Sequence, residues 1–297
     1  MADKVEELAW KRAKELFGAE HVNIQSYSGS TANYSVFASV LNPGDLILSM
    51  RLDQGGHLTH GSPANWVSKI YRHVFYGVDP KTELIDYDEL EKIAKENKPK
   101  MIIAGASSYS RLIDYERISK IAEEVGAYFM VDMAHIAGLV AAKVIPSPIP
   151  YADFVSSSTT KTFCSARSGM VFCKEKYAKI LDKGTFPGSL GSLMFNTMAA
   201  KTWSFKYAAS QEFHDIMAQV IVNAKCLAEE LQKYGIRIGL TAVSQRGLKE
   251  PEIREIAAII NQVAEAPEDE ANLKACKAKA EALIAKFPLY PAGSFDD

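Results

Sequence analysis

The sequence predicts an α/β protein with a mainly parallel sheet flanked by helices, followed by a smaller and mostly helical C-terminal part. From about residue 20 to residue 175, apolar segments of strand length alternate with segments of helical periodicity, which is typical of a parallel sheet covered by helices. Beyond Phe205 the strand signal fades, and long amphipathic segments follow. We therefore expect a large domain over residues 1–210 and a small domain over residues 211–297.

The elements of the large domain can be placed one by one. The first segment has apolar residues at helical spacing and is expected to be a helix that ends at Gly18. Short apolar runs bounded by turn residues predict strands, and longer segments of helical period predict helices. The expected strands are Val22–Gln25, Leu46–Met50, Met101–Ala104, Tyr128–Val131, Phe154–Ser156 and Met170–Cys173, and the expected helices are Thr31–Leu41, Asp86–Glu96 and Tyr115–Val125.

The C-terminal part reads as three amphipathic helices. They are expected at Phe213–Tyr234, Glu250–Val263 and Glu268–Phe287, with polar breaks between them. The residues around Ile236–Ile238 are the one short stretch here that could form a strand.

Composition narrows the functional classes. The formal charge of −2, from 34 basic and 36 acidic residues, argues against a dedicated nucleic-acid surface. The four cysteines form no C-x-x-C pair, which disfavours a disulfide framework or a zinc site and fits a reducing, intracellular setting. The charged N-terminal segment is no signal peptide, and no apolar run is long enough to span a bilayer. We expect a soluble, cytoplasmic protein.

Asp132 and Lys161 are the most informative pair in the chain. Twenty-nine positions separate them, and each follows an apolar, strand-like run. A pyridoxal phosphate enzyme needs a carboxylate that keeps the pyridine nitrogen protonated and a lysine amine that holds the cofactor aldehyde. Taken singly, however, the aspartate fits a helix N-cap and the lysine fits a solvated side chain.

A small-residue loop precedes the helix expected at Thr31–Leu41. Ser28, Gly29 and Ser30 would offer backbone amides, hydroxyl groups and the positive end of the helix dipole to a phosphate. Ordinary N-capping by Ser30 or Thr31 explains the same residues equally well.

A glycine-rich segment, Gly55–Gly61, follows the strand at Leu46–Met50. Glycines allow close approach of a ligand, and His57 is suited to stack on an aromatic ring or to move protons. His57 and His60 also have a spacing that metal ligands show, but no third ligand recurs nearby, so we expect no metal site. His60 is then a simple loop residue.

Three further residues are candidates by position. Ser107 and His135 follow predicted strands, and ligands of open α/β sheets bind at that carboxyl edge, although both residues also suit turns or caps. Arg237 lies in the apolar segment Gly235–Gly239, where its guanidinium suits a substrate carboxylate or a structural ion pair.

Taken together, these motifs resemble the serine hydroxymethyltransferase family, which consists of pyridoxal phosphate enzymes with an aminotransferase-like fold. The resemblance follows family order along nearly the whole chain. The matching stretches are Arg12–Gly18, Ser28–Asn33, Gly55–Pro63, Lys98–Ile103, Val131–Leu139, Thr159–Thr162, Phe186–Gly188 and Gly235–Gly239.

The resemblance implies a role for each candidate residue. Lys161 would carry the cofactor, Asp132 would pair with the ring nitrogen, and His57 would stack on the ring. The phosphate would lie on Ser28, Gly29 and Ser30, with the hydroxyl of Thr160 beside it, and Ser107 and His135 would lie near the phenolic oxygen. Arg237 would bind the amino-acid carboxylate, and Arg167 matches a family arginine close to the lysine. A rival dinucleotide-binding fold is disfavoured because no G-x-G-x-x-G opens the first β-α unit.

The sequence also departs from the family pattern. The long family segment that precedes the helix starting this chain, and that supplies a catalytic glutamate, has no counterpart here. A strand-containing stretch with part of the folate surface is expected to be missing between Tyr234 and Gly235. Thr160 stands where the family has histidine. The resemblance therefore implies serine–glycine interconversion or folate-independent retro-aldol cleavage, with tetrahydrofolate a doubtful co-substrate. It also implies a homodimer, and the alternative is a catalytically impaired paralogue that associates with a full-length relative.

Overall fold

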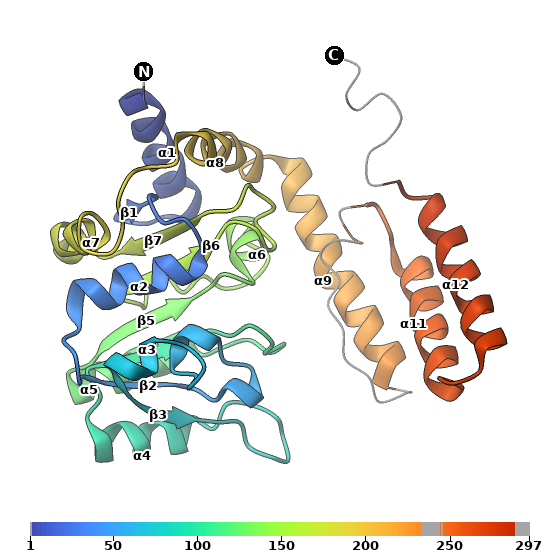
Figure 1. Cartoon of the computed structure of the whole chain (residues 1–297), viewed down its shortest axis with the longest axis horizontal. Helices are drawn as coiled ribbons and strands as arrows, with labels where there is room; N and C mark the ends of the chain where they lie inside the picture. The colour runs from blue at the N-terminus through green and yellow to red at the C-terminus, as the bar shows by residue number, and fades with distance from the viewer. Residues whose placement is uncertain (1, 233–243, 245, 289–297) are drawn as a thin grey trace. The chain divides into compact units, whose positions relative to one another are not determined.

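The computed structural model describes residues 2–232, 244 and 246–288. The chain divides into two compact units, Met1–Ser210 and Gln211–Asp297, which are described separately below (Figure 1).

The large unit is built on one seven-stranded sheet with the strand order β1-β7-β6-β5-β4-β2-β3. The four pairings among β2, β3, β4, β5 and β6 are parallel, while β7 runs antiparallel to both β6 and β1. The strands are β1 (His21–Asn23), β2 (Leu46–Met50), β3 (Arg72–Tyr76), β4 (Met101–Ala104), β5 (Tyr128–Asp132), β6 (Phe154–Ser158) and β7 (Gly169–Cys173). The expected α/β fold with a mainly parallel sheet is confirmed.

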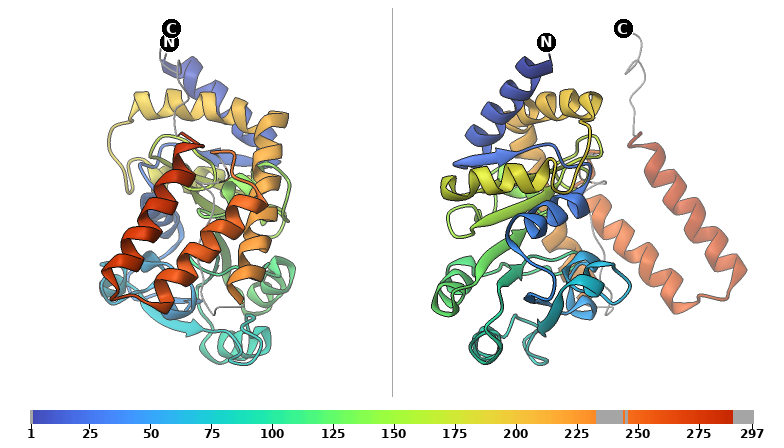
Figure 2. Two further views of the ribbon diagram at one scale, coloured as in Figure 1. Left: turned by 90° about the vertical axis from the view of Figure 1, so that its right-hand side faces the viewer. Right: turned by 60° about the vertical axis from the view of Figure 1, so that its left-hand side comes forward.

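Helices cover both faces of this sheet, as the turned views in Figure 2 show. They are α1 (Ala2–Phe17), α2 (Gly29–Val40), α3 (Val67–Ile70), α4 (Tyr87–Asn97), α5 (Tyr115–Val125), α6 (Ala137–Ala141), α7 (Ala178–Thr185) and α8 (Phe195–Ala208), with short 3-10 turns at Leu52–Gln54, Leu58–His60 and Glu175–Tyr177.

Alternate residues of the strands β5, β6 and β7 point to opposite faces of the sheet, as the two-residue period of a strand requires. Met130, Phe154 and Val171 are fully buried in one cluster with Phe37 of α2. On the neighbouring position of β7, Phe172 packs against Phe17 of α1, with 4.8 Å between ring centroids. Both faces of the central strands are therefore buried, which explains why their sequences are continuous apolar runs.

The structure corrects several predicted boundaries. Strand β3 was not predicted, because its sequence Arg-His-Val-Phe-Tyr mixes polar and apolar residues and lies at a partly exposed sheet edge. Strand β6 continues two residues beyond the predicted Ser156, because the polar Ser157 and Ser158 are buried and remain in register with β7. Strand β1 ends at Asn23, before the predicted Gln25.

The second unit contains three long helices. They are α9 (Gln211–Gln232), α11 (Glu250–Glu265) and α12 (Glu270–Ala285). A core of Leu227, Leu231, Leu248 and Ile253 packs between α9 and α11. The strand considered at Ile236–Ile238 lies outside the described residues. None of the helices described in either unit is both long and apolar enough to cross a membrane.

Candidate functional site

A cavity of about 160 Å³ opens at the carboxyl edge of the parallel strands of the large unit. Asp132 and Ser158 are the last residues of β5 and β6, and Ser107 follows β4. The cavity is lined by Ser28, Gly29, Ser30, His57, Ala106, Ser107, Asp132, Ala134, His135, Ser158, Thr160, Lys161 and Arg167. The fold thus brings together the sequence-predicted site residues with the exception of Arg237, which lies outside the described residues.

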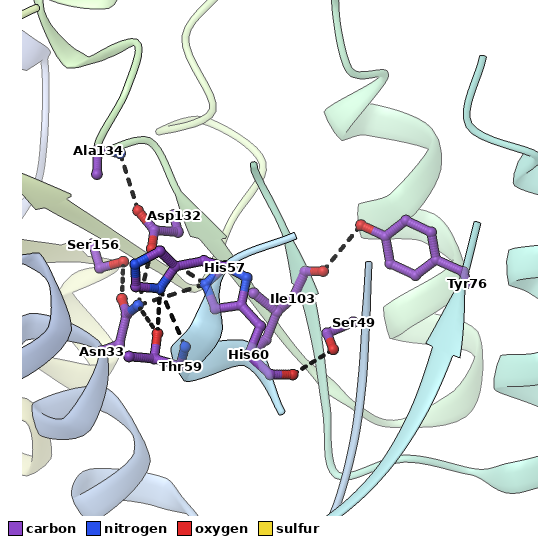
Figure 3. A network of polar contacts seen from close by, with 10 residues as sticks. All are labelled: Asn33, Ser49, His57, Thr59, His60, Tyr76, Ile103, Asp132, Ala134 and Ser156. Atoms are coloured by element: carbon purple, nitrogen blue, oxygen red, sulfur yellow. Dashed lines mark hydrogen bonds and ion pairs between the residues drawn. The ribbon is translucent and has the colours of Figure 1, made fainter. Parts of the chain in front are cut away.

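Asp132 is the centre of a buried hydrogen-bond network, drawn in Figure 3. Its Oδ2 accepts from Asn33 Nδ2 at 2.9 Å and from His60 Nε2 at 3.2 Å. Its Oδ1 accepts from the backbone N–H of Ala134 at 3.0 Å. Asp132 therefore ends its strand as a buried acceptor of three hydrogen bonds and is not the helix N-cap that its sequence context also allowed.

The register of the sheet explains how the network forms. β5 and β6 pair Asp132 with Ser156, so both side chains point to the face that α2 covers. Asn33 of α2 reaches both, since its Oδ1 accepts from the Ser156 hydroxyl at 2.5 Å. Asn33 also donates to Thr59 Oγ1 at 2.7 Å, which ties in the glycine-rich segment.

This network holds the carboxylate of Asp132 in its charged form. Burial alone would raise the pKa of Asp132, but the hydrogen bond and charge of His60 and the hydrogen bonds from Asn33 and from the N–H of Ala134 outweigh burial and lower the pKa to about 2. A carboxylate that stays ionised while it lines a cavity is suited to a cationic or N–H donor partner.

The two histidines on the cavity wall are biased toward their neutral forms. Burial is the largest cause that lowers the pKa of His57, and it is also the largest for His135, where the charge of Lys161 adds to it. His57 Nδ1 accepts from the backbone N–H of Thr59 at 3.2 Å, so a neutral His57 carries its proton on Nε2. A neutral ring suits stacking on an aromatic ligand or accepting a proton.

The residues expected to bind the phosphate, Ser28, Gly29 and Ser30, lie at the N-terminus of α2 and are called the phosphate cradle below. Ser28 is the N-cap, and it forms a capping box with Thr31, whose N–H lies 3.2 Å from Ser28 Oγ. The alternative that Ser30 or Thr31 is the cap is therefore wrong. Gly29 and Ser30 line the cavity. Their N–H groups belong to the first helical turn, where no carbonyl of the helix accepts a hydrogen bond from them, so they can bind an anion.

Small residues let α2 approach the sheet closely at this point. A Cβ atom at Gly29 would lie 3.1 Å from the Cβ of Ser158. The hydroxyl of Ser158 lies 3.0 Å from that of Thr160, which places Thr160 beside the amides of α2. The loop that carries Lys161 is thus brought next to the cradle.

Lys161 lies in the loop between β6 and β7, three residues beyond the end of β6. The hydroxyl of Thr162 donates to the carbonyl of His135 at 2.9 Å and accepts from the N–H of Gly138 at 2.9 Å. These bonds fix the loop to the segment after β5. The side chains of Lys161 and Arg167 are exposed and lie on the cavity wall, where a ligand can reach them.

Sequence reasoning missed Asn33, Thr59, His60, Ser156 and Ser158. His60 was expected to be a simple loop residue, but it is 1% exposed and is bonded to Asp132. The three-residue spacing between His57 and His60 is a sequence signal for His60, but by itself this spacing suggests a metal site and not a hydrogen bond to a carboxylate. Asn33 lies four residues after Gly29, on the same helix face, and that period could have found it.

A metal ligand set is also present among the described residues. His57, His60 and Asp132 offer atoms that lie within 4.8 Å of one another. The expectation that no third ligand lies near the histidines was therefore wrong, because Asp132 arrives from a distant strand. Oδ2 of Asp132 already accepts two hydrogen bonds, and a metal ion would have to displace them.

Comparison with known protein families identifies the family to which the chain belongs. The family model described as serine hydroxymethyltransferase matches residues 1–236 of this chain. The chain belongs to the serine hydroxymethyltransferase family. The matched range includes the whole cavity lining and ends one residue before Arg237.

Membership of the serine hydroxymethyltransferase family implies a transferase-type domain that binds pyridoxal phosphate. The residues present fit this cofactor. An ionised buried carboxylate, a helix N-terminus lined by small residues and an exposed lysine amine share one cavity, and they match the ring nitrogen, the phosphate and the aldehyde.

Proposed function

We propose that this chain binds pyridoxal phosphate through Lys161 and acts on glycine, serine or related β-hydroxy amino acids. The observation that carries the proposal is the placement of the ionised Asp132 and of Lys161 on the wall of one cavity, beside the N-terminus of α2. Pyridoxal phosphate, when bound, supplies an electron sink for a bond that breaks at the α-carbon of an amino acid.

The side chains of the cavity take complementary roles in this proposal. Asp132 would accept a hydrogen bond from the ring nitrogen and keep that nitrogen protonated, because the pKa of Asp132 itself is about 2. The first-turn amides at Gly29 and Ser30 bind the phosphate, with Ser28 and Thr160 beside them. His57 would stack on the ring. Lys161 would hold the aldehyde, and its amine could move protons at the α-carbon of the substrate.

The remaining residues serve the substrate and the phenolic oxygen. Ser107 and His135 lie on the cavity wall and would donate or accept hydrogen bonds near that oxygen. Arg167 lines the cavity and supplies positive charge for the substrate carboxylate, a role we also propose for Arg237. Serine–glycine interconversion and folate-independent retro-aldol cleavage both use this set of residues.

The first test is cofactor attachment. Adding pyridoxal phosphate to the purified protein should produce a visible absorbance band, and borohydride reduction followed by peptide mass analysis should locate the cofactor on Lys161. Lys161→Ala should abolish the band, whereas Lys183→Ala, at an exposed lysine of α7, should keep it. Absence of a lysine-dependent band would contradict the proposal.

The second test is the reaction. Glycine and serine should change the spectrum of the cofactor-bound protein, and serine or a β-hydroxy amino acid should be cleaved at the bond between the α- and β-carbons. Assays with and without tetrahydrofolate separate interconversion from folate-independent cleavage. Cofactor attachment without any turnover would instead favour the impaired paralogue.

A second candidate function is association with another copy or with a full-length relative. Leu52 and Phe75 are 46% and 40% exposed, and they line a second cavity of about 210 Å³ that also includes His57 and His60. Exposed apolar side chains next to site residues favour a protein partner at this place. Sedimentation of the wild type and of Leu52→Lys/Phe75→Lys tests this, since the variant should be the smaller species.

A further inference from the structure

Lys201 is a buried lysine that the proposed chemistry does not use. It lies within α8 and is 1% exposed. Its Nζ donates to the backbone carbonyl of Ile24 and, at 3.2 Å, to that of Gly169. A lysine amine is usually buried only where it donates hydrogen bonds, because burying an unpaired charged amine costs roughly several kcal/mol of folding free energy.

The two carbonyls lie where β1 leaves the sheet. The ladder between β1 and β7 ends with the pair Asn23 and Val171. Ile24 and Gly169 lie just beyond this pair, so the ladder no longer supplies a donor to their carbonyls. The amine of Lys201 takes the place of the missing donors and joins the end of β1 to the start of β7.

The same junction leads directly to the phosphate cradle. The N–H of Gly169 and the hydroxyl of Ser168 donate to the carbonyl of Ser26, at 2.8 and 2.7 Å. A Cβ atom at Gly169 would overlap the carbonyl oxygen of Ser28. Ser28 is the N-cap of α2, so the junction that Lys201 closes lies directly against the start of this helix.

We propose that Lys201 is a positioning residue for the phosphate cradle. It fixes the segment from Ile24 to Ser28 against β7, and it thereby sets the direction of the first-turn amides of α2. The inference rests on the proposed function for its ligand, but the positioning itself is a property of the protein without ligand.

The charge of Lys201 gives the proposal a second consequence. Burial lowers the pKa of Lys201 to about 7, and among the described residues Glu6 of α1 is the charged group that acts on it and raises the pKa. Below about pH 7 the amine is positive and its hydrogen bonds to the two carbonyls are strengthened by the charge, whereas above it the neutral amine still has two N–H groups for the same carbonyls.

The test compares Lys201→Met with Lys206→Met, a matched change at an exposed lysine of the same helix. Amide hydrogen exchange without ligand should be faster over residues 24–31 in K201M and unchanged in K206M. The preference for pyridoxal phosphate over pyridoxal, which isolates the phosphate, should fall about tenfold in K201M, because first-turn amides of α2 that lose their direction weaken their charged hydrogen bonds to the phosphate. The deficit should be larger at pH 6 than at pH 9.

The proposal would be overturned if K201M showed the amide hydrogen exchange of the wild type over residues 24–31 and also the wild-type preference for pyridoxal phosphate over pyridoxal. If K201M does not fold, the same measurements on Lys201→Gln decide by the same criteria. If the wild type does not bind pyridoxal phosphate, the proposed function fails, while hydrogen exchange and stabilisation by inorganic phosphate still decide the role of Lys201.

Discussion

Asn33 of α2 donates its side-chain N–H to the buried carboxylate of Asp132, with 2.9 Å between Nδ2 and Oδ2. The two residues are 99 positions apart, and the same amide accepts from Ser156. One side chain thus joins the helix that offers the phosphate cradle to the strand that ends in the carboxylate.

Asn33→Leu should destabilise the protein by about 1–3 kcal/mol, because it leaves the buried partners Asp132 and Ser156 short of hydrogen bonds. Urea unfolding measures the change. Asn97→Ala, at an exposed asparagine of α4, should change the free energy of unfolding much less. Equal losses in the two variants would mean that the network does not stabilise the fold.

Stability should depend on pH through Asp132. Its pKa of about 2 lies below the value of about 3.9 for an unfolded aspartate, so the unfolded chain binds the proton more readily at acid pH. The stabilisation, on the order of 2 kcal/mol, is present above about pH 4 and is lost as the pH falls toward 2. The difference in unfolding free energy between wild type and Asp132→Asn should therefore shrink between pH 5 and pH 2.5, and a constant difference would contradict the assignment.

His57 and His135 should add a second acid-sensitive step. Burial lowers the pKa of both below the ordinary value near 6.5, so protonation favours the unfolded chain. Stability that is present above about pH 6.5 is lost as the pH falls through the lowered values. The double variant His57→Phe/His135→Phe should lose less stability than wild type between pH 7 and pH 5, whereas His214→Gln, on the exposed side of α9, should behave like wild type.

Gly105→Ala should be far more damaging than Gly126→Ala, although both glycines have positive φ angles, of 106° and 70°. A Cβ atom at Gly105 would overlap the carbonyl oxygen of Asp132, whereas one at Gly126 meets open space. We expect a loss above about 2 kcal/mol for Gly105→Ala and about 1 kcal/mol for Gly126→Ala, the latter from backbone strain alone. Thermal unfolding distinguishes them, and similar losses would exclude the clash with Asp132.

Much of the fold was predictable because its strands are buried on both faces. The strands Leu46–Met50 and Met101–Ala104 and the helix Tyr115–Val125 have the bounds that their apolar patterns predict. The edge strand Arg72–Tyr76 was not predictable in the same way, since a partly exposed edge admits polar residues and gives no clear period.

The candidate site was predictable only as a set of residue types at strand ends. The sequence placed Asp132, Ser107 and the Ser28–Ser30 loop at one edge of the sheet, and the cavity contains them. The sequence could not assign roles to His60, Asn33 or Lys201, because the hydrogen bonds of a buried polar side chain depend on partners that are distant in the chain.

The sequence by itself determined the alternation of strands and helices, the family and the residue types available for the chemistry, because periodicity and motif order are local properties of the chain. The tertiary structure alone decided that Asp132 is held ionised by His60 and Asn33, that Ser28 caps the cradle helix, and that Lys201 closes the junction behind it. The physical reason is that hydrogen-bond geometry and burial, which set charge and orientation, arise only when segments far apart in sequence pack together.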